Sequence, residues 1–246
     1  AVAIAKVIAA DKCEIYSDVD GIYTSDPRLV KTAKRLKEID YDSMLELSSL
    51  GAKVLHNRAV EMAKKYDVVL SIKSSFIEGE GTLVHKNPIE KTLISGVVVD
   101  DNIATISMIG LKDTPGVAYK IFSKLANENI SVDIVLQSVG RDNTKDIVFT
   151  VDIENANHSE RLLHAVSQEL GAKDTVVNKE VAKLSVVGAG LESNPLIGAM
   201  IFKTLYEADI NVDMIATSEI KMSLIVDKKD AEKGAILLHD RLIDHL

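Results

Sequence analysis

The sequence contains no tryptophan, and aromatic residues make up only 4 % of its 246 residues. Such a chain offers few side chains on which nucleic-acid bases can stack, and its formal net charge of −8 disfavours a polyanionic partner. No apolar run approaches the roughly 18 residues that span a bilayer, and no signal peptide is visible. The sequence therefore predicts a cytoplasmic protein that binds neither nucleic acid nor membranes.

Cysteine is also scarce. Cys13 is the single cysteine, so an internal disulfide is excluded, and its apolar neighbours predict a buried, unreactive thiol. The six histidines show no metal-ligand spacing, and we predict no metal site in the chain. The remaining composition, 46 % hydrophobic and 27 % charged, is typical of a globular chain with room for two or three cores.

Two segments, 103–151 and 181–226, read as copies of one unit. The first contains IATISMIGLKDTPGVAYKIFSKLANENISVDIVLQ and the second VAKLSVVGAGLESNPLIGAMIFKTLYEADINVDMIAT. The period of about 80 residues is far longer than that of solenoid repeats, so each copy is expected to be a small domain. The duplication points to a paired ligand-binding module. Identical residues hold equivalent places: Ala104 and Ala182, Ser107 and Ser185, Gly110 and Gly188, Pro115 and Pro195, Ile130 and Ile210, Val132 and Val212, Asp133 and Asp213.

Both copies show the same order of elements. Alternating apolar residues predict strands, and apolar residues at 3.6 spacing predict helices. A proline, Pro115 or Pro195, is expected in the first turn of each first helix. Cap-type residues precede the prolines: Asp113, Thr114, Ser193 and Asn194. We expect strands at 103–109, 132–139, 146–151 and 174–178 in the first copy and at 181–187, 212–217 and 222–226 in the second, with closing helices at 159–170 and 230–245.

The second copy lacks a counterpart to the last strand of the first. An apolar segment at 93–99, just before the first copy, is a spare strand. We expect this segment to complete the sheet of the second copy, which would leave the first unit inserted within the second.

The first third of the chain has a different character. It opens with AVAIAKVIAA, a helix without a cap, which suggests that the chain begins inside a domain. Strands are expected at 13–16 and 68–72, and helices at 41–47 and within GAKVLHNRAVEMAKKY. This order predicts half of an open α/β sheet, with one sheet edge and some helix faces uncovered.

Polar residues crowd the loop SDVDGIYTSDPR, which follows the first expected strand. Ligands of α/β sheets bind at such strand ends. Asp18 and Asp20 can bind ribose, a metal or another cation; Arg28 can hold phosphate, and Tyr23 can pack on a base. Lys53 can bind phosphate near a helix start. The alternative is that these Asp-Gly and Asp-Pro pairs only mark turns and that Lys53 is a solvated helix residue.

The same residues resemble a known family. The strings EIYSDVDGIYTSDPRLV and LSSLGAKVLHNRAVEMAKKY resemble the nucleotide-site half of an aspartokinase, an amino-acid kinase that phosphorylates the side-chain carboxylate of aspartate with MgATP. The repeats, with DTPG, ISVDIVLQ, INVDMIATSEIKMS and VVGAGLESNP, resemble the tandem ACT domains of that family's regulatory tail. The resemblance covers nearly the whole chain and implies feedback inhibition by end-product amino acids: lysine, and in some members threonine.

The resemblance also implies a fold and a nucleotide site. The fold is α/β (α+β): part of an amino-acid-kinase sheet at 1–88, a ferredoxin-like βαββαβ ACT domain at 103–179, and a second ACT domain formed by 89–102 plus 180–246. The family's catalytic lysine and aspartate-binding stretch have no counterpart in this sequence, so we expect the chain alone not to phosphorylate aspartate. The resemblance assigns nucleotide contacts to Ser17, Asp18, Tyr23, Arg28, Lys53 and Val54.

An amino-acid effector offers a carboxylate, an ammonium group and a side chain for recognition. Backbone N–H groups at the helix starts after Asp113 and Ser193 can meet the carboxylate, and Asp113 or Asp133 can take the ammonium. The alternative is that Asp113 and Asn194 only cap helices and that Asp133 and Asp213 simply occupy exposed strand positions. The second repeat has SNPLIG in place of DTPG, so it can be a pairing partner without a ligand. The resemblance assigns effector contacts to Asp113, Thr114, Pro115, Gly116, Val117, Ala118, Ser131, Val132, Asp133 and Gln137 in the first repeat and to Asn194, Pro195, Asn211, Val212, Ser218 and Glu219 in the second.

Exposed sheet edges and the family's side-by-side ACT pairing predict a homodimer. The leading interpretation is the regulatory portion of an aspartokinase with part of its kinase domain. Two alternatives stay open: an intact kinase whose upstream residues lie outside this sequence, and a free-standing ACT sensor, which would have no use for a nucleotide loop. The sequence does not decide between lysine and threonine, or the number of sites per dimer.

Overall fold

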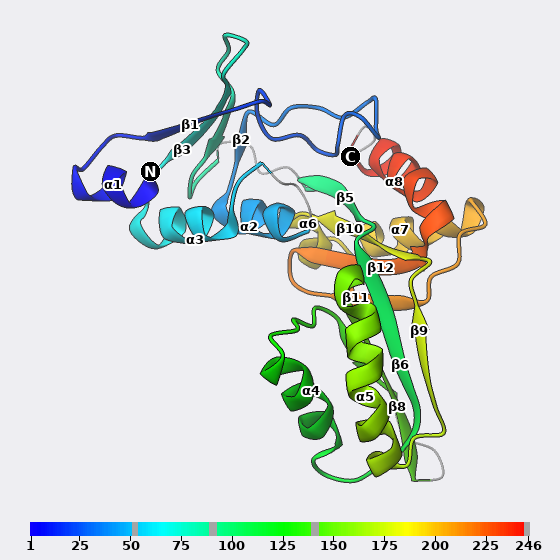
Figure 1. Ribbon diagram of the computed structural model, residues 1–246. Coiled ribbons are helices and arrows are strands. Elements are labelled where there is room, and N and C mark those ends of the chain that lie inside the picture. The colour runs from blue at the N-terminus through cyan, green and yellow to red at the C-terminus, as the bar shows by residue number, and fades with distance from the viewer. Residues whose placement is uncertain (51–53, 89–92, 139–142, 244–246) are drawn as a thin grey trace. The chain divides into compact units, whose positions relative to one another are not determined.

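The computed structural model describes residues 1–50, 54–88, 93–138 and 143–243 (Figure 1). The chain divides into two compact units, which we call the large unit (1–100, 184–224 and 230–246) and the small unit (101–183 and 225–229). This division into two units differs from the three domains expected from the sequence, and the expected domain boundaries stay a prediction.

The N-terminal part of the large unit is built on a four-stranded mixed sheet in the order β1-β3-β4-β2. β1 and β3 are parallel, β4 is antiparallel to β3, and β2 is parallel to β4. The expected helix, strand, helix, strand order is confirmed; the two- and three-residue strands β2 and β4 were not expected. The elements are α1 (Val2–Val7), β1 (Cys13–Ser17), β2 (Glu38–Ile39), α2 (Tyr41–Ser49), α3 (Asn57–Tyr66), β3 (Leu70–Ser74) and β4 (Thr82–Val84).

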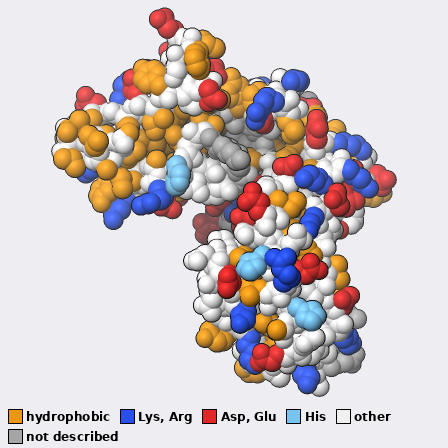
Figure 2. All heavy atoms as spheres, viewed as in Figure 1, with side chains coloured by type: hydrophobic (Ala, Val, Ile, Leu, Met, Phe, Trp, Pro, Cys, Tyr) orange, Lys and Arg blue, Asp and Glu red, His pale blue; other side chains and the backbone are white. Residues whose placement is uncertain are grey.

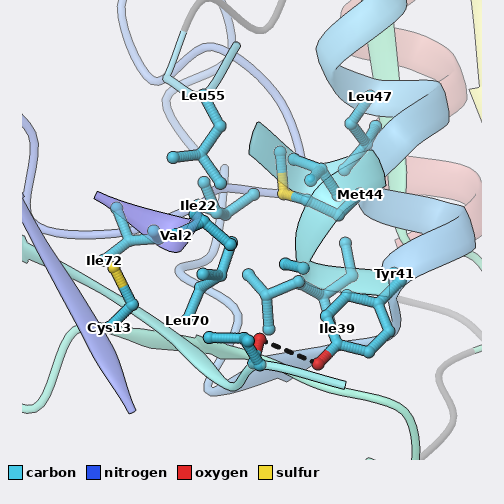
Figure 3. Close-up of a cluster of buried hydrophobic side chains, with 14 of the residues drawn as sticks. Val2, Cys13, Ile22, Ile39, Tyr41, Met44, Leu47, Leu55, Leu70 and Ile72 are labelled. Atoms are coloured by element: carbon cyan, nitrogen blue, oxygen red, sulfur yellow. Dashed lines mark hydrogen bonds between the residues drawn. The ribbon is translucent and has the colours of Figure 1, made fainter. Parts of the chain in front are cut away.

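A hydrophobic core lies between this sheet and its helices (Figure 3). Met44 and Leu47 of α2 and Leu70 and Ile72 of β3 are almost fully buried in it, and Cys13 is buried as predicted. The Tyr41 hydroxyl donates a hydrogen bond to the carbonyl oxygen of Val68 at 2.9 Å. Burial, followed by the nearby Asp67 carboxylate, raises the pKa of Tyr41 to about 12, so this phenol stays protonated and keeps its donor role.

One edge of the sheet and one helix face are uncovered, as predicted. β1 is an outer strand of the sheet among the described residues. On α1 the side chains of Ile4, Val7 and Ile8 are between 65 % and 84 % exposed, and Figure 2 shows hydrophobic side chains gathered over this helix. Apolar residues at this density on one short helix mark a surface that favours contact with further protein.

The rest of the large unit carries most of the second repeat, whose residues 181–183 and 225–229 fall in the small unit. Its sheet has the order β11-β12-β10-β5, so the strand that precedes the first repeat pairs with the second repeat's first strand, as predicted. The first repeat is thus inserted within the second. The elements are β5 (Gly96–Asp100), β10 (Val181–Val187), α6 (Gly190–Ser193), α7 (Pro195–Glu207), β11 (Met214–Thr217), β12 (Lys221–Asp227) and α8 (Lys228–Ile243).

The small unit is the first repeat. Its antiparallel sheet has the order β7-β8-β6-β9, and α4 and α5 cover one face (Figure 1). The core between them includes Ile106, Ile121, Phe149 and Leu163, all fully buried. The elements are β6 (Ile103–Lys112), α4 (Val117–Asn127), β7 (Val135–Gln137), β8 (Thr144–Asp152), the 3-10 turn η1 (Ile153–Asn155), α5 (Ala156–Leu170) and β9 (Asp174–Asn178).

The helix starts differ from the sequence expectation in one of the two repeats. In the second, Pro195 opens α7 and the Asn194 side chain accepts a hydrogen bond from the backbone N–H of Leu196, as predicted. In the first, α4 begins only at Val117, with Gly116 at the N-cap and no side-chain cap. Gly116 has φ of 92°, and this left-handed conformation ends the turn after Pro115 before the helix can start. The expectation that Asp113 caps this helix is therefore wrong.

Candidate nucleotide and effector sites

The loop that follows β1 carries most of the predicted nucleotide residues. We call residues 17–36 the nucleotide loop. Ser17 ends β1, and its hydroxyl donates to the carboxylate of Asp18 at 2.9 Å. β1 and β3 are parallel, so the loop leaves the sheet at the carboxyl ends of both strands, where α/β sheets bind ligands. The first two predicted residues therefore lie side by side at a strand end.

Tyr23 lies in a polar cluster around Asp20. The Tyr23 hydroxyl donates to Asp20 Oδ1 at 3.0 Å, and Arg35 Nη1 lies 3.2 Å from Asp20 Oδ2. Burial, helped by the Asp20 carboxylate, raises the pKa of Tyr23. The sequence analysis missed Arg35, which reaches the cluster because the chain folds back and residues 23 and 35 form an antiparallel bridge.

Arg28 projects from the exposed side of the same loop. Its guanidinium binds the Asp26 carboxylate through two nitrogens, with a shortest distance of 2.7 Å, while 89 % of the side chain stays exposed. Arg28 holds the pKa of Asp26 below its usual range. The positive group is thus oriented but open to solvent, as a phosphate contact requires.

The two remaining predicted nucleotide residues follow α2 in the sequence. Lys53 is outside the described residues. Val54 is half-buried and packs against the core of the large unit. Within the described part of the chain, no group of three or more His, Cys, Asp or Glu side chains is arranged to hold a metal ion.

The predicted effector residues of the first repeat fall at two ends of its sheet. The loop 113–118 follows β6, and the backbone N–H of Asp113 donates to the carbonyl oxygen of Asn143 at 2.8 Å. Asp133 precedes β7, and its backbone N–H donates to the carbonyl oxygen of Thr150 at 3.3 Å. Asn143, just before β8, and Thr150, on β8, are seven residues apart, which is roughly 23 Å at 3.3 Å per residue of extended chain. One repeat by itself therefore does not bring the two sets together.

Lysines missed by the sequence analysis engage both candidate carboxylates. Lys145 Nζ lies 2.9 Å from Asp113 Oδ1, and Lys183 Nζ lies 2.6 Å from Asp133 Oδ2. Both lysine side chains are nearly buried, at 11 % and 5 % exposure, whereas each aspartate side chain is about half exposed. The carboxylates are held in place from inside the unit and are open to solvent on the other side.

The other predicted residues of the first repeat are mostly exposed. Gly116 faces open space, with no atom within 4 Å of the position its Cβ would take. Val117 is buried in the core of the small unit. Thr114, Pro115, Ser131 and Gln137 are exposed, and Ala118 and Val132 are half-buried.

In the second repeat three of the predicted residues are engaged in local hydrogen bonds. Asn194 caps α7, the Asn211 amide donates to Asp213 Oδ1 at 3.0 Å, and the backbone N–H of Ser218 donates to Lys221. Pro195 and Glu219 are exposed and Val212 is half-buried. No helix of the described residues is long and apolar enough to cross a membrane.

Comparison with known proteins defines the class first. Residues 1–74 match the Amino acid kinase family, and residues 106–166 and 184–242 match the ACT domain. The two repeats are therefore ACT domains that follow part of an amino-acid-kinase domain.

The particular family follows from individual relatives. The chain is 43 % identical to the aspartate kinase of Pseudomonas fluorescens (strain SBW25), over 97 % of this chain and 58 % of that protein. It is 34 % identical to the regulatory subunit of aspartate kinase from Thermus thermophilus, with a TM-score of 0.58, over 61 % of this chain and 99 % of that one. The chain belongs to the aspartokinase family. It spans about 60 % of the length of the curated relatives it matches.

Escherichia coli aspartokinase III is similar over 99 % of this chain and 55 % of its own length, with 27 % identity and a TM-score of 0.82. That structure is a complex with aspartate and ADP. A second structure of the same protein, with lysine and aspartate, has 28 % identity and a TM-score of 0.77 over 98 % of this chain and 54 % of that one.

Proposed function

We propose that this chain is the regulatory region of a cytoplasmic aspartate kinase. Lysine, threonine or both bind at its ACT domains and control the ATP-dependent phosphorylation of L-aspartate to 4-phospho-L-aspartate. The observation that carries the proposal is the open loop before α4, which leaves the start of an 11-residue helix without a side-chain cap. Helix starts of this kind bind carboxylates, and the related Escherichia coli enzyme has been solved with lysine.

The effector site is completed by a second copy of the chain. A free amino acid is much shorter than the distance between the loop 113–118 and Asp133, so both sets contact one ligand only if they come from different copies. β7 is an outer strand of the small unit's sheet, and Val135 on it is 45 % exposed. Antiparallel pairing of two β7 strands about a two-fold axis places the start of one beside the end of the other. Asp133 of one copy then lies toward the partner's loop 113–118 and Gln137.

Isothermal titration with lysine and with threonine, each alone, tests effector binding to the purified chain. Asp133→Ala should abolish binding, whereas Asp213→Ala, its counterpart in the second repeat, should leave affinity unchanged. Lys183→Gln breaks the ion pair but keeps the Asp133 carboxylate, so retained binding in this variant assigns the loss to the effector contact. Sedimentation should show a dimer. Binding by neither amino acid, or unchanged affinity in Asp133→Ala, contradicts the proposal.

We further propose that the nucleotide loop contributes to the ATP site of the parent kinase. Ser17, Asp18 and Tyr23 offer hydroxyl and carboxylate partners for ribose, and Arg28 offers an exposed guanidinium for phosphate. Lys53 and Val54 complete this set as predicted from the sequence. When bound, MgATP supplies the transferred phosphoryl group.

The chain alone is proposed to be inactive. Its match to the Amino acid kinase family covers only residues 1–74, and phosphoryl transfer depends on positioning and charge stabilisation by a complete site. Aspartate-dependent ADP release by the purified chain measures this directly. Turnover above the rate without enzyme would refute the inactivity and favour an intact kinase.

A further inference from the structure

A histidine from the last helix of the second ACT domain reaches the nucleotide loop. His239 lies on α8 and is fully buried within the large unit. Its Nε2 is 2.8 Å from the hydroxyl oxygen of Thr24, and its Nδ1 is 3.3 Å from that of Thr32. Both threonines belong to the nucleotide loop, so one imidazole ring holds it at two points.

The hydrogens around this ring can be placed without conflict. The backbone N–H of Lys34 donates to Thr24 Oγ1 at 2.9 Å, which leaves the Thr24 hydroxyl hydrogen for His239 Nε2. Nδ1–H then donates to Thr32 Oγ1, and the Thr32 hydroxyl donates to the carboxylate of Asp240 at 2.7 Å. These hydrogen bonds are compatible with a neutral ring that carries its hydrogen on Nδ1, set between two hydroxyls of the nucleotide loop and 3.6 Å from Asp240 Oδ1.

A second element of the same ACT domain holds the loop at the same residue. The backbone N–H of Val97, on β5, donates to the carbonyl oxygen of Thr24 at 2.8 Å. A Cβ on Gly96 would lie only 2.9 Å from that oxygen, so the close approach needs glycine there. Thr24 is thus held by its backbone from β5 and by its side chain from α8.

We propose that His239 is a positioning residue for the nucleotide loop, through which the state of the second ACT domain reaches the nucleotide site. The inference rests on the proposed function and deepens it. Hydrogen bonds weaken steeply with distance and angle, so a small shift of α8 releases the side chains of Thr24 and Thr32 together, while the backbone bond from Val97 to Thr24 remains. The released loop no longer presents Tyr23 and Arg28 in fixed positions.

Amide hydrogen exchange of the full chain tests the clamp. The amides of Thr24 and Leu36 report on the loop because they donate to carbonyl oxygens within it. His239→Leu should speed their exchange roughly tenfold, since two hydrogen bonds are lost, and leave β3 unchanged. His239→Gln, which can still reach one hydroxyl, should restore part of the protection. His164→Gln, the same substitution at an exposed site of α5, is the matched control.

Thr32→Val removes one of the two hydrogen bonds of the ring, that of Nδ1, keeps the one to Thr24, and serves if His239→Leu does not fold. Unchanged loop exchange in both variants overturns the proposal. Equal acceleration in the loop and in β3 also overturns it, because that result describes a purely structural histidine.

A second set of amide-exchange measurements adds L-lysine and L-threonine separately. Either amino acid that binds should change loop exchange more in the parent chain than in Thr32→Val, while its affinity for both proteins stays the same. If an amino acid binds but leaves the parent loop unchanged, the relay is wrong and the proposed function stands. If neither amino acid binds, the proposed function fails. Amide exchange of the variants without ligand still tests whether His239 holds the loop.

Discussion

The two ACT domains share one fold but begin their first helix in opposite ways. In the first, the loop before α4 is open and the helix has no side-chain cap. In the second, the four-residue helix α6 fills the equivalent loop and Asn194 caps α7. The start of α4 is therefore open to an anion, whereas the start of α7 is capped and preceded by α6. The difference supports our proposal that the first domain binds the effector, whereas most of the second domain shares one compact unit with the kinase-like part.

Two equivalent glycines show the same division of roles. Gly110 and Gly188 hold matching places in the repeats but are needed for different reasons. Gly110 has φ of 67°, in a strand irregularity between Met108 and Leu111, and the three atoms nearest to a Cβ there all belong to the Lys173 side chain. A Cβ on Gly188 would lie 2.3 Å from the carbonyl oxygen of Leu93, which is backbone. The first glycine serves an irregularity within a strand and the second a close packing contact.

The largest predicted effect follows from that contact. Gly188→Ala should lower the free energy of unfolding by about 3 kcal/mol, because backbone must move to admit the methyl group. Gly110→Ala should cost about 1 to 2 kcal/mol, the strain of a left-handed alanine, since Lys173 can swing aside. Urea unfolding of both variants measures the difference.

Gly198→Ala is the control for these substitutions. Gly198 lies within α7, and its added Cβ would make an ordinary contact of 3.7 Å with Met222. Alanine should therefore stabilise the helix, by about 0.5 to 1 kcal/mol. Equal losses at positions 110 and 188 would remove the packing distinction between the two domains.

A smaller effect separates binding from stability at the two helix starts. Asp113→Asn should weaken effector binding roughly tenfold, because the ammonium loses a charged partner. Its stability should fall by less than about 1 kcal/mol, since the pair with Lys145 is half exposed on the aspartate side. Asn194→Ala should lower stability by about 1 kcal/mol through the lost cap and leave affinity unchanged. Titration and urea unfolding of both variants decide; weaker binding by Asn194→Ala would instead place a ligand on the second domain.

Local pattern was enough to predict most of the fold. Alternating and 3.6-spaced apolar residues identified the strands and helices of both repeats, and the spare strand at 93–99 indicated the insertion. The pattern failed where a partner distant in sequence defines the element. β2 and β4 are too short to show periodicity and exist because they pair with each other and with β3.

The candidate sites were predictable only in part, for the same reason. Motif resemblance identified the loops but not the side chains that hold them. Arg35 contacts Asp20, Lys183 contacts Asp133 and His239 contacts Thr24, the last across 215 residues of sequence. Such contacts depend on how elements pack, and no spacing within either segment reveals them.

The smallest predicted effect compares the large unit with the small one under acid. The Glu14 carboxylate, on β1 of the large unit, pairs with Lys12 Nζ at 2.8 Å and with Lys73 Nζ at 2.9 Å. It also accepts a hydrogen bond from the Tyr16 hydroxyl at 3.0 Å. These partners, Lys12 foremost, lower the pKa of Glu14 from 4.5 to about 2. The folded state thus favours the carboxylate, so its stabilising contribution is complete above about pH 4.5 and is lost as the pH falls toward 2.

Amide exchange followed from pH 5 to 2.5 should show an acid-dependent loss of protection in β1 and β3. Glu14→Gln should flatten that loss, as should Lys73→Met, and neither variant should alter the pH profile of β6 and β8 in the small unit. An unchanged acid profile of β3 in Glu14→Gln would show that other groups govern the acid response of the large unit.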